Sequence, residues 1–357
     1  MKVLILISSI NNSGGTERVG SMLANGLSEM GHEIVLGSIG STDKPFFTIN
    51  ENIKLVSFLS FPRFKLFRIP TTVYNIRKLL KKERIDTLIV VETLCVQFTL
   101  PATIGLPVNH ICWEHFNFNS DAGKASRRVA RQLAARYCDS VVTLTERDKE
   151  YWLKGTQHKS QITAIANPCP FPVQEYIKEK NTKIVLAVGR LTHIKGFDML
   201  LEAWIQVNEV MPEWVLKIVG EGEDRAKLTD FIKKNKLTDS VELVGNTNDV
   251  SQYYKEAEIF CLSSRFEGFP MVLLETLAFG LPVVSFDCDT GPAEILEDTG
   301  SILVAKNDVS ELATSLIKLM SNEKQRKTIG LRSKEKAEEY QPENIINQWV
   351  ELLEDRK

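Results

Sequence analysis

Two glutamates, Glu267 and Glu275, flank the start of an apolar helix that opens with a Gly- and Pro-rich turn. Glu275 falls inside the helix, on a stretch expected to be buried, where a carboxylate is costly unless it has a partner or a ligand. The backbone N–H groups at a helix start lack partners within the helix and form a natural seat for a phosphate. A carboxylate beside such a seat suits a ligand with both phosphates and hydroxyls, and a sugar nucleotide is such a ligand.

A second group of candidates, Gly189, Arg190 and Lys195, follows the apolar run 183–188. The glycine relaxes the backbone, and the two cations can converge from a strand end and a helix start. Arg offers a planar fork and Lys a point charge, so the pair can neutralise a diphosphate. Alone, the two cations would be read as surface charges, but together with the later pair of glutamates they favour a diphosphate site.

Two further candidates follow expected strands in the first half of the chain. Gly14 and Gly15 lie in the turn after run 3–8, where glycines let a ligand approach the backbone. The alternative is a tight turn that requires positive φ. His115 follows run 108–112, where it can hydrogen-bond a substrate hydroxyl or transfer a proton, and the alternative is a structural histidine.

Three loops carry weaker signals. The loops 219–222 and 244–250, the latter with Asn246, can bind a base through backbone groups or simply connect elements. Asp287 and Asp289 form a D-x-D sequence that can hold a metal–diphosphate, while Asp289 or Thr290 can equally cap the following helix. Because no other carboxylates or histidines stand at ligand spacing, we expect no metal site.

Thirteen apolar runs alternate with helical patterns along the chain. Their near-continuous hydrophobicity is typical of parallel strands covered on both faces, which predicts an α/β protein with doubly wound sheets. The expected strands are 3–8, 33–38, 54–58, 86–91, 108–112, 140–144, 162–165, 183–188, 214–219, 241–243, 259–262, 282–286 and 301–304.

The expected domain boundary lies near residues 167–182, because 167–172 holds three prolines and cannot continue a helix or a central strand. We therefore expect two Rossmann-like domains, 1–170 and 171–340, that face a central cleft. The remaining segment, 341–357, contains an amphipathic helix, which can pack on the second domain or cross back to the first. Its apolar face consists of Ile345, Ile346, Trp349, Leu352 and Leu353.

The composition restricts the partners of the protein. The 357-residue chain has a formal net charge of −2, which gives no argument for nucleic acid. Basic and aromatic residues interleave in the segment 61–84, which can dock on an anionic lipid surface or form a solvated helix face. The six cysteines show no C-x-x-C pair, as expected in a reducing compartment. No apolar run is long enough to span a membrane, and the apolar start reads as a core strand and not as a signal peptide.

Taken together, these motifs resemble the retaining glycosyltransferases of family 4, which have the GT-B fold. The resemblance runs over essentially the whole chain and is strongest in the ordered motifs at 189–196 and 219–222 and in the pair Glu267 and Glu275. The stretch 286–295 is similar to members that build bacterial polysaccharides and glycans from UDP-sugars.

The resemblance implies a role for each candidate. Arg190 and Lys195 would grip the donor diphosphate, and Glu275 would hold the ribose hydroxyls. Glu267 would contact the transferred sugar, and His115 would meet that sugar near its 6-hydroxyl. The C-terminal helix would cross back to the first domain. The other donor-binding residues would be Gly14, Gly15, Gly189, Asn246, Gly268, Phe269, Pro270, Met271 and Val272.

The resemblance also implies an activity. The expected protein is a glycosyltransferase without metal or cofactor that moves a hexose or N-acetylhexosamine from a nucleotide sugar, with UDP favoured over GDP. The expected acceptor is a hydroxyl of a glycan or lipid-linked glycan in bacterial surface polysaccharide biosynthesis. We expect a cytoplasmic protein with peripheral contact to the inner membrane face. A non-catalytic nucleotide-sugar-binding protein and a GT-B epimerase remain as alternatives.

Overall fold

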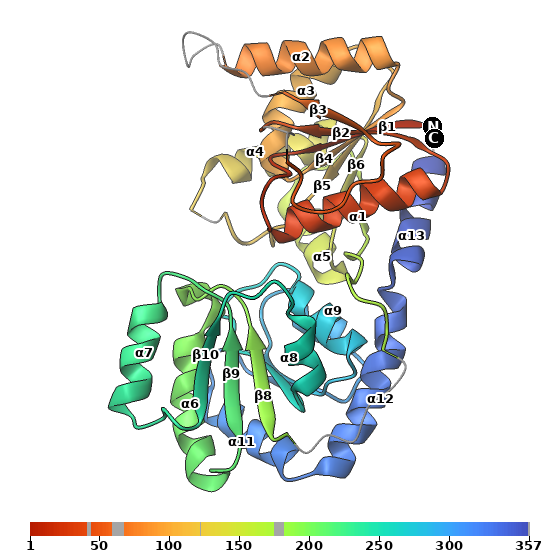
Figure 1. Cartoon of the computed structure of the whole chain (residues 1–357). Helices are drawn as coiled ribbons and strands as arrows, with labels where there is room; N and C mark the ends of the chain where they lie inside the picture. The colour runs from red at the N-terminus through yellow and green to blue at the C-terminus, as the bar shows by residue number, and fades with distance from the viewer. Residues whose placement is uncertain (41–43, 59–67, 122, 175–181, 356–357) are drawn as a thin grey trace. The chain divides into compact units, whose positions relative to one another are not determined.

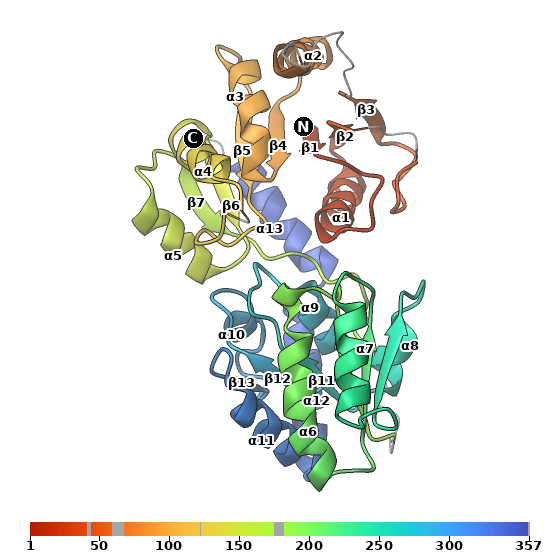
Figure 2. The same ribbon diagram turned by 90° about the vertical axis from the view of Figure 1, so that its left-hand side faces the viewer.

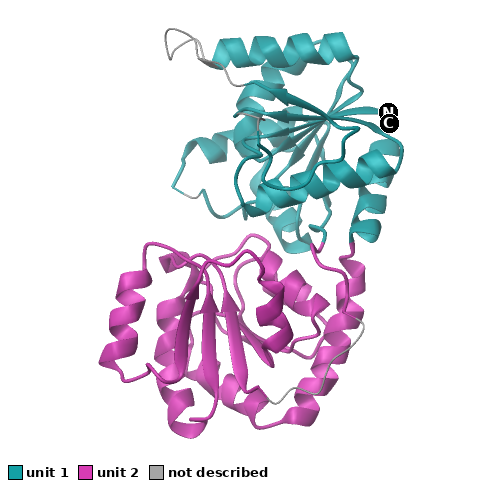
Figure 3. Cartoon of the chain, in the orientation of Figure 1, with its two compact units in different colours: residues 1–168, 342–357 teal, residues 169–341 magenta. Residues whose placement is uncertain are grey.

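A computed structural model describes residues 1–355 except for residues 41–43, 59–67, 122 and 175–181. Strands and helices alternate along the chain (Figure 1). The chain divides into two compact units (Figure 3). Unit 1 comprises Met1–Pro168 and Pro342–Lys357, and unit 2 comprises Cys169–Gln341.

Unit 1 contains a seven-stranded parallel sheet with the order β3-β2-β1-β4-β5-β6-β7. The central strands β1, β4 and β5 are almost entirely buried, as parallel strands between two helix layers must be. The order reverses between β1 and β4, so the loops after these strands leave toward opposite faces of the sheet and create a switch point. The strands are β1 (Lys2–Ile7), β2 (Glu33–Ser38), β3 (Lys54–Ser57), β4 (Thr87–Val91), β5 (Asn109–Trp113), β6 (Ser140–Thr143) and β7 (Gln161–Ala164).

The helices of unit 1 cover both faces of this sheet. Helices α2 (Arg68–Glu83), α3 (Val96–Thr103) and α4 (Ser126–Tyr137) share one apolar core with β1 and β4 (Figure 2). Helix α1 (Gly15–Glu29) packs against α13 (Pro342–Glu354), where a Cβ on Gly26 would lie 2.6 Å from Ile346 Cγ1. Trp349 of α13 meets Trp113 of β5 edge-on at 5.0 Å. The short helix η2 (Thr93–Cys95) and α5 (Glu146–Gly155) complete the unit.

Unit 2 contains a six-stranded parallel sheet with the order β10-β9-β8-β11-β12-β13. This order reverses between β8 and β11, which places a second switch point there. The strands are β8 (Ile184–Val188), β9 (Val215–Val219), β10 (Val241–Gly245), β11 (Ile259–Leu262), β12 (Val283–Phe286) and β13 (Ile302–Val304). The helices are η3 (His193–Lys195), α6 (Phe197–Val210), α7 (Arg225–Lys234), α8 (Ser251–Glu256), α9 (Met271–Ala278), α10 (Pro292–Ile295), α11 (Val309–Met320) and α12 (Glu323–Glu339).

The predicted fold class is confirmed by the two parallel, helix-covered sheets. Each of the thirteen predicted strands corresponds to a strand whose ends differ by at most two residues. The predicted apolar face of α13 is buried, except that Leu352 is half-buried. All six cysteines are buried free thiols. Within the described part of the chain, no helix combines the length and the apolar character that a membrane span requires.

Candidate functional site

The loops after β8 and β11 meet at the carboxyl edge of the unit 2 sheet, because these two strands are neighbours in the sheet. Gly196 ends η3 with a φ of 66°, and a Cβ at this position would lie only 2.0 Å from Ser263 O. Only glycine combines this backbone conformation with so close an approach. Ser263 Oγ also donates to Lys195 O at 3.0 Å, so the β11 loop determines where Lys195 stands.

This contact brings two predicted residues together. Lys195 Nζ lies 2.6 Å from Glu267 Oε1, and Ser264 Oγ donates to the same carboxylate oxygen at 2.6 Å. Glu267 is 8% exposed, while the Lys195 side chain is 25% exposed. The cation is therefore held by a buried carboxylate and keeps one side open to solvent.

The predicted residues 268–272 lead directly from Glu267 into α9. The N-cap residue of this helix, Pro270, makes no side-chain cap. Leu273 N donates to Pro270 O at 2.9 Å, so the N–H groups of Met271 and Val272 are those available to an anion, in keeping with the predicted phosphate seat. Phe269 and Pro270 are buried, whereas Gly268, Met271 and Val272 are half-buried.

The loop after β12 packs against this turn. Thr290 Oγ1 lies 3.2 Å from Glu267 O and 2.9 Å from Gly268 O, and a Cβ on Gly291 would lie 2.5 Å from Pro270 Cδ. The suggestion that Asp289 or Thr290 caps the next helix is wrong, because the N-cap of α10 is Gly291, which has no side chain to make a cap. No group of three or more His, Cys, Asp or Glu side chains suited to a metal ion occurs in the portion of the chain that the structure describes.

Glu275 is 5% exposed in the middle of α9, as the apolar helix predicted. The buried carboxylate has a hydrogen-bond partner that the sequence did not reveal: Tyr254 Oη donates to Glu275 Oε2 at 2.8 Å. Tyr254 is itself fully buried and stacks on Phe279 at 5.3 Å. The carboxylate is thus held within the protein, and a contact with ribose hydroxyls stays a prediction.

The remaining candidates of unit 2 occupy more open positions. Arg190 is exposed at the end of β8, and its guanidinium forms no hydrogen bond or ion pair with any residue that the structure describes. Asn246 is exposed after β10, which lies two strands, about 10 Å, away from β8. The structure therefore does not place Asn246 beside Lys195. Gly189 is half-buried, and a Cβ on Gly220 would lie 2.0 Å from Gly189 O, so the glycine of the 219–222 loop has a packing role.

In unit 1, Gly14 and Gly15 form the start of α1 after β1. Gly14 has a φ of −73°, so the alternative that this turn needs positive φ is wrong for that residue. The side chain of Glu17, which is 7% exposed, folds back over the turn, so a Cβ on Gly14 would lie 2.3 Å from Glu17 Oε2. Glu17 also accepts a hydrogen bond from Thr16 Oγ1 at 2.8 Å.

His115 follows β5 at the same carboxyl edge of the unit 1 sheet as Gly14. Its ring lies 4.4 Å from the Trp113 ring, and its Nε2 is shielded from solvent with no hydrogen-bond partner among the residues that the structure places. Burial lowers the pKa of His115 to about 3, so the ring is neutral near pH 7. A neutral imidazole can bind a hydroxyl, but it is not a general acid at this pH.

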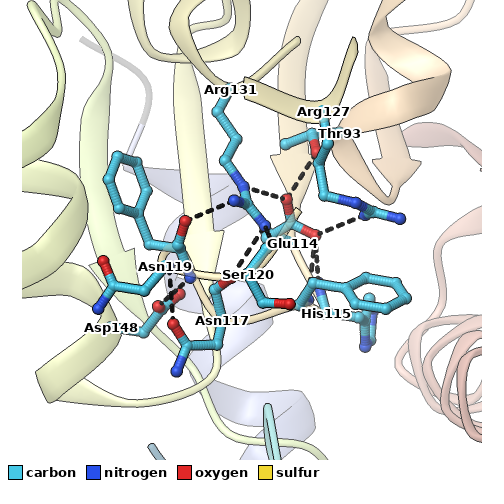
Figure 4. A network of polar contacts seen from close by, with 11 residues as sticks. Thr93, Glu114, His115, Asn117, Asn119, Ser120, Arg127, Arg131 and Asp148 are labelled. Carbon is cyan, nitrogen blue, oxygen red and sulfur yellow. Dashed lines mark hydrogen bonds and ion pairs between the residues drawn. The ribbon is translucent and has the colours of Figure 1, made fainter. Parts of the chain in front are cut away.

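Glu114 anchors the loop that carries His115 (Figure 4). This fully buried carboxylate accepts hydrogen bonds from Thr93 Oγ1 at 2.6 Å and Arg131 Nε at 3.3 Å. It also accepts the backbone N–H groups of His115 and Phe116, both at 3.0 Å. The Arg131 guanidinium donates in turn to the carbonyl oxygens of Asn117 and Ser120. The network fixes the loop backbone and thereby the position of the histidine.

Sequence reasoning missed this network, although signals for it exist. Arg127 and Arg131 are four residues apart on a helix, so they share a face, and both are only 2% exposed. Of the five basic residues from Lys124 to Arg136, only Lys124, Arg128 and Arg136 are exposed. An acid directly before His115, together with two arginines at helical spacing, is the pattern that could have indicated a buried ion-pair network.

Comparison with known families assigns both halves of the chain. Residues 13–170 match the family described as Glycosyltransferase Family 4, and residues 173–336 match Glycosyl transferases group 1. The chain is 35% identical to an uncharacterized glycosyltransferase of Haemophilus influenzae, with 99% of each chain covered. It is 33% identical to the amylovoran biosynthesis glycosyltransferase AmsD of Erwinia amylovora, again with 99% of each covered.

A third relative and a solved structure extend the comparison. The chain is 27% identical to a Campylobacter jejuni α-1,4-N-acetyl-D-galactosaminyltransferase whose name includes a PP-undecaprenol-linked glycan, with 100% of this chain and 99% of that protein covered. It also superposes with a TM-score of 0.81 on an S. aureus TarM mutant solved with fondaparinux, α-GlcNAc-glycerol and UDP. That structure is 15% identical, with 99% of this chain and 100% of the other covered. From the family matches, the relatives and the fold, the chain belongs to glycosyltransferase family 4 and is a glycosyltransferase with the GT-B fold.

Proposed function

We propose that this glycosyltransferase moves a hexose or N-acetylhexosamine from a UDP-sugar to a hydroxyl of a glycan or lipid-linked glycan, in the biosynthesis of a bacterial surface polysaccharide. The names of the Erwinia and Campylobacter relatives support this class of acceptor, and UDP in the TarM structure supports the donor. The observation that carries the proposal is the Lys195–Glu267 pair beside the open start of α9.

In the proposed reaction, the positive charges at the carboxyl edge of unit 2 stabilise the departing diphosphate. Lys195 supplies one charge, which Glu267 and Ser264 hold in place, and the exposed Arg190 supplies a second. The N–H groups at the start of α9 add partial positive charge. Because these groups can neutralise the leaving group, we expect no metal requirement.

The transferred sugar passes through an oxocarbenium-like state, and the acceptor hydroxyl attacks from the face that the diphosphate leaves. The leaving phosphate takes the acceptor proton, so the configuration at the anomeric carbon is retained and no residue of the protein has to act as nucleophile. Glu267 is assigned to the donor sugar, Glu275 to the ribose, and the neutral His115 to a sugar hydroxyl. A product with inverted anomeric configuration in proton NMR would contradict this mechanism.

Thermal unfolding with UDP, GDP, ADP and their sugar conjugates tests the donor. A ligand at 100 times its Kd adds about 2.7 kcal/mol, which raises the Tm of a unit of this size by roughly 5–10 °C. We expect UDP compounds to give this shift equally in EDTA and in Mg²⁺, and Lys195→Ala to abolish it. Lys234→Ala, an exposed lysine on α7, is the matched control. A folded protein that responds to no nucleotide would refute the donor site.

Transfer to acceptor glycosides separates the proposed function from its alternatives. A non-catalytic binding protein would respond to UDP-sugars without forming product. An epimerase would change the donor sugar in the absence of any acceptor. Neither alternative has a specific observation in its favour beyond those that also support the transferase.

We further propose that unit 1 contacts an anionic membrane through the layer α2–α4. Of the predicted segment 61–84, residues 61–67 lie outside the described part, but α2 carries the exposed cations Lys78, Lys81 and Lys82. Large apolar side chains are exposed on the same layer, with Tyr74 at 64%, Ile104 at 71% and Tyr137 at 62%. Cations and exposed apolar groups together suit an anionic lipid surface.

Flotation with phosphatidylglycerol vesicles tests this contact. Each lysine near the surface contributes about 1 kcal/mol, so Lys78→Gln/Lys81→Gln/Lys82→Gln should lower partitioning roughly 100-fold at low salt. Lys233→Gln/Lys234→Gln on α7 of unit 2 is the control and should leave partitioning unchanged. If the wild-type protein does not bind vesicles at low salt, the membrane proposal fails while the transferase proposal stands.

A further inference from the structure

Glu92 has a backbone conformation that its residue type does not explain. It follows β4 with a φ of 71° and a ψ of 133°. This combination lies outside the left-handed helical region and close to the region that glycine alone adopts readily. Its backbone is held on both sides, because Glu92 N donates to Trp113 O at 2.8 Å and Cys95 N donates to Glu92 O at 3.0 Å. These bonds explain the conformation, but not why a glutamate occupies it in place of a glycine.

The side chain of Glu92 makes no contact within the protein that would explain why a glutamate occupies this position. It is half-buried and forms no hydrogen bond or ion pair with any residue that the structure describes. The charged groups that act on it are Glu114, Arg127, Glu17 and Lys124. Burial and the neighbouring Glu114 raise the pKa of Glu92, while Arg127 opposes that shift.

Arg127, one of the charged groups that act on Glu92, also has N–H groups without a hydrogen-bond partner among the described residues. This guanidinium is 2% exposed and stacks on the Phe116 ring at 3.8 Å. Its Nη1 lies 3.6 Å from Glu114 Oε1, too far for a hydrogen bond, and no described residue accepts a hydrogen bond from its Nε (Figure 4). Buried polar groups are normally paired, so an orphaned arginine N–H beside an unpaired carboxylate indicates a place for a polar ligand.

The position of Glu92 in the sheet also indicates a ligand site. Strand β4 lies between β1 and β5, so Glu92 stands between the Gly14 turn and His115 at the carboxyl edge. This is the switch point of unit 1, where open α/β sheets bind ligands. Glu17 and Glu114 act on Glu92 together with the cations Arg127 and Lys124. A carboxylate such as that of Glu92 readily accepts hydrogen bonds from sugar hydroxyls.

We propose that Glu92 is an acceptor-binding residue whose carboxylate receives hydrogen bonds from hydroxyls of the acceptor sugar, with the Arg127 N–H groups beside it. This inference rests on the proposed function, since it assigns the acceptor side of the same reaction. The strained backbone is then tolerated because it places a carboxylate at the switch point, which glycine or an aliphatic residue could not provide.

Two substitutions test the proposal with octyl hexosides and octyl N-acetylhexosaminides as acceptor probes. Glu92→Gly relieves the backbone, so we expect a higher Tm together with a 10- to 100-fold higher acceptor KM, the range for a lost hydrogen bond to a charged group. Glu92→Gln keeps the shape without the charge and should raise the acceptor KM about 10-fold. Lys236→Gly, at a φ of 57° after α7, is the matched control and should raise Tm without changing the acceptor KM.

Donor readouts separate this inference from the proposed function. Stabilisation by UDP and slow hydrolysis of the donor without acceptor should be the same in Glu92→Gly, Glu92→Gln and wild type. If both variants keep the acceptor KM within twofold of wild type, the role of Glu92 is overturned while the transferase stands. If the wild-type protein transfers to no probe and shows no response to UDP, the proposed function fails and the role of Glu92 falls with it.

Discussion

Replacing Gly196 with alanine tests whether the close approach of the β8 and β11 loops positions Lys195. A Cβ at this site would lie 2.0 Å from Ser263 O and 2.8 Å from Met199 Cε. A carbon and a carbonyl oxygen need at least about 3.3 Å, so the two loops must separate by roughly 1 Å. The Met199 side chain can rotate away, but the Ser263 carbonyl belongs to the backbone and cannot.

The expected loss of stability is the sum of three effects. A side chain at the φ of 66° costs roughly 1–2 kcal/mol relative to glycine. Losing the 3.0 Å bond from Ser263 Oγ to Lys195 O costs about 1 kcal/mol. Crowding against the backbone adds about 1–3 kcal/mol. The free energy of unfolding should therefore fall by about 3–6 kcal/mol, and a shift of about 1 Å in Lys195 should lower kcat/KM about 100-fold.

Urea unfolding, UDP titration and initial rates of transfer measure these effects. Gly300→Ala is the control, because Gly300 also has positive φ, at 79°, but its nearest neighbour would lie at an ordinary 3.4 Å. The control should show only the backbone cost, about 1–2 kcal/mol, with UDP binding unchanged. If Gly196→Ala costs no more than Gly300→Ala and still binds UDP, the contact with Ser263 does not position Lys195, and the reasoning is refuted.

Two other predictions concern the buried carboxyl groups of unit 1. Burial raises the pKa of Asp148 to about 7. Between about pH 4 and pH 7 the folded protein therefore keeps a proton on Asp148 that the unfolded chain has lost. The free energy of unfolding should fall by up to about 4 kcal/mol as pH rises through this range. Asp148→Asn should remove this fall in urea unfolding, and parallel pH profiles of variant and wild type would contradict the shift. Glu114→Gln should cost about 3–5 kcal/mol, because it leaves Arg131 buried without its carboxylate. Asp121→Asn, which loses a pair with the exposed Arg128, should cost under about 1 kcal/mol by the same measurement. Equal costs for the two variants would mean that the Glu114 network is not buried as described.

The strands could be predicted because their signal is local. A run such as 259–262 is apolar on both faces, as a central parallel strand requires. Lys195 and Glu267 could be predicted for a related reason, since both follow such runs and the carboxyl ends of parallel strands meet at one edge. Asn246 shows the limit of that argument, because a position after a strand does not reveal how far the strand lies from the switch point.

The partners of the buried charges could not be predicted, because they come from distant parts of the chain. Tyr254 meets Glu275 only once α8 and α9 pack on the same sheet, and no spacing in the sequence connects them. Arg127 and Arg131 share a helix face by spacing, but whether that face points inward depends on where α4 packs. The φ of Glu92 has no sequence signal at all, because glycine and not glutamate is the residue that marks such a conformation.

The two sheets share a topology, and the proposed chemistry is divided between them. In unit 1 the order reverses between β1 and β4, and in unit 2 it reverses between β8 and β11. Near these reversals unit 1 carries Glu17, at the start of α1, and Glu92, whereas unit 2 carries Arg190 and Lys195, the latter paired with Glu267. A diphosphate is drawn to the cations and repelled by the carboxylates, while a neutral sugar can use carboxylates as acceptors for its hydroxyls. Both edges arise from the same strand order, so their charged side chains distinguish them. Glu92→Lys, which reverses one charge at the unit 1 edge, should impair use of the acceptor. It should not create a second donor site in unit 1.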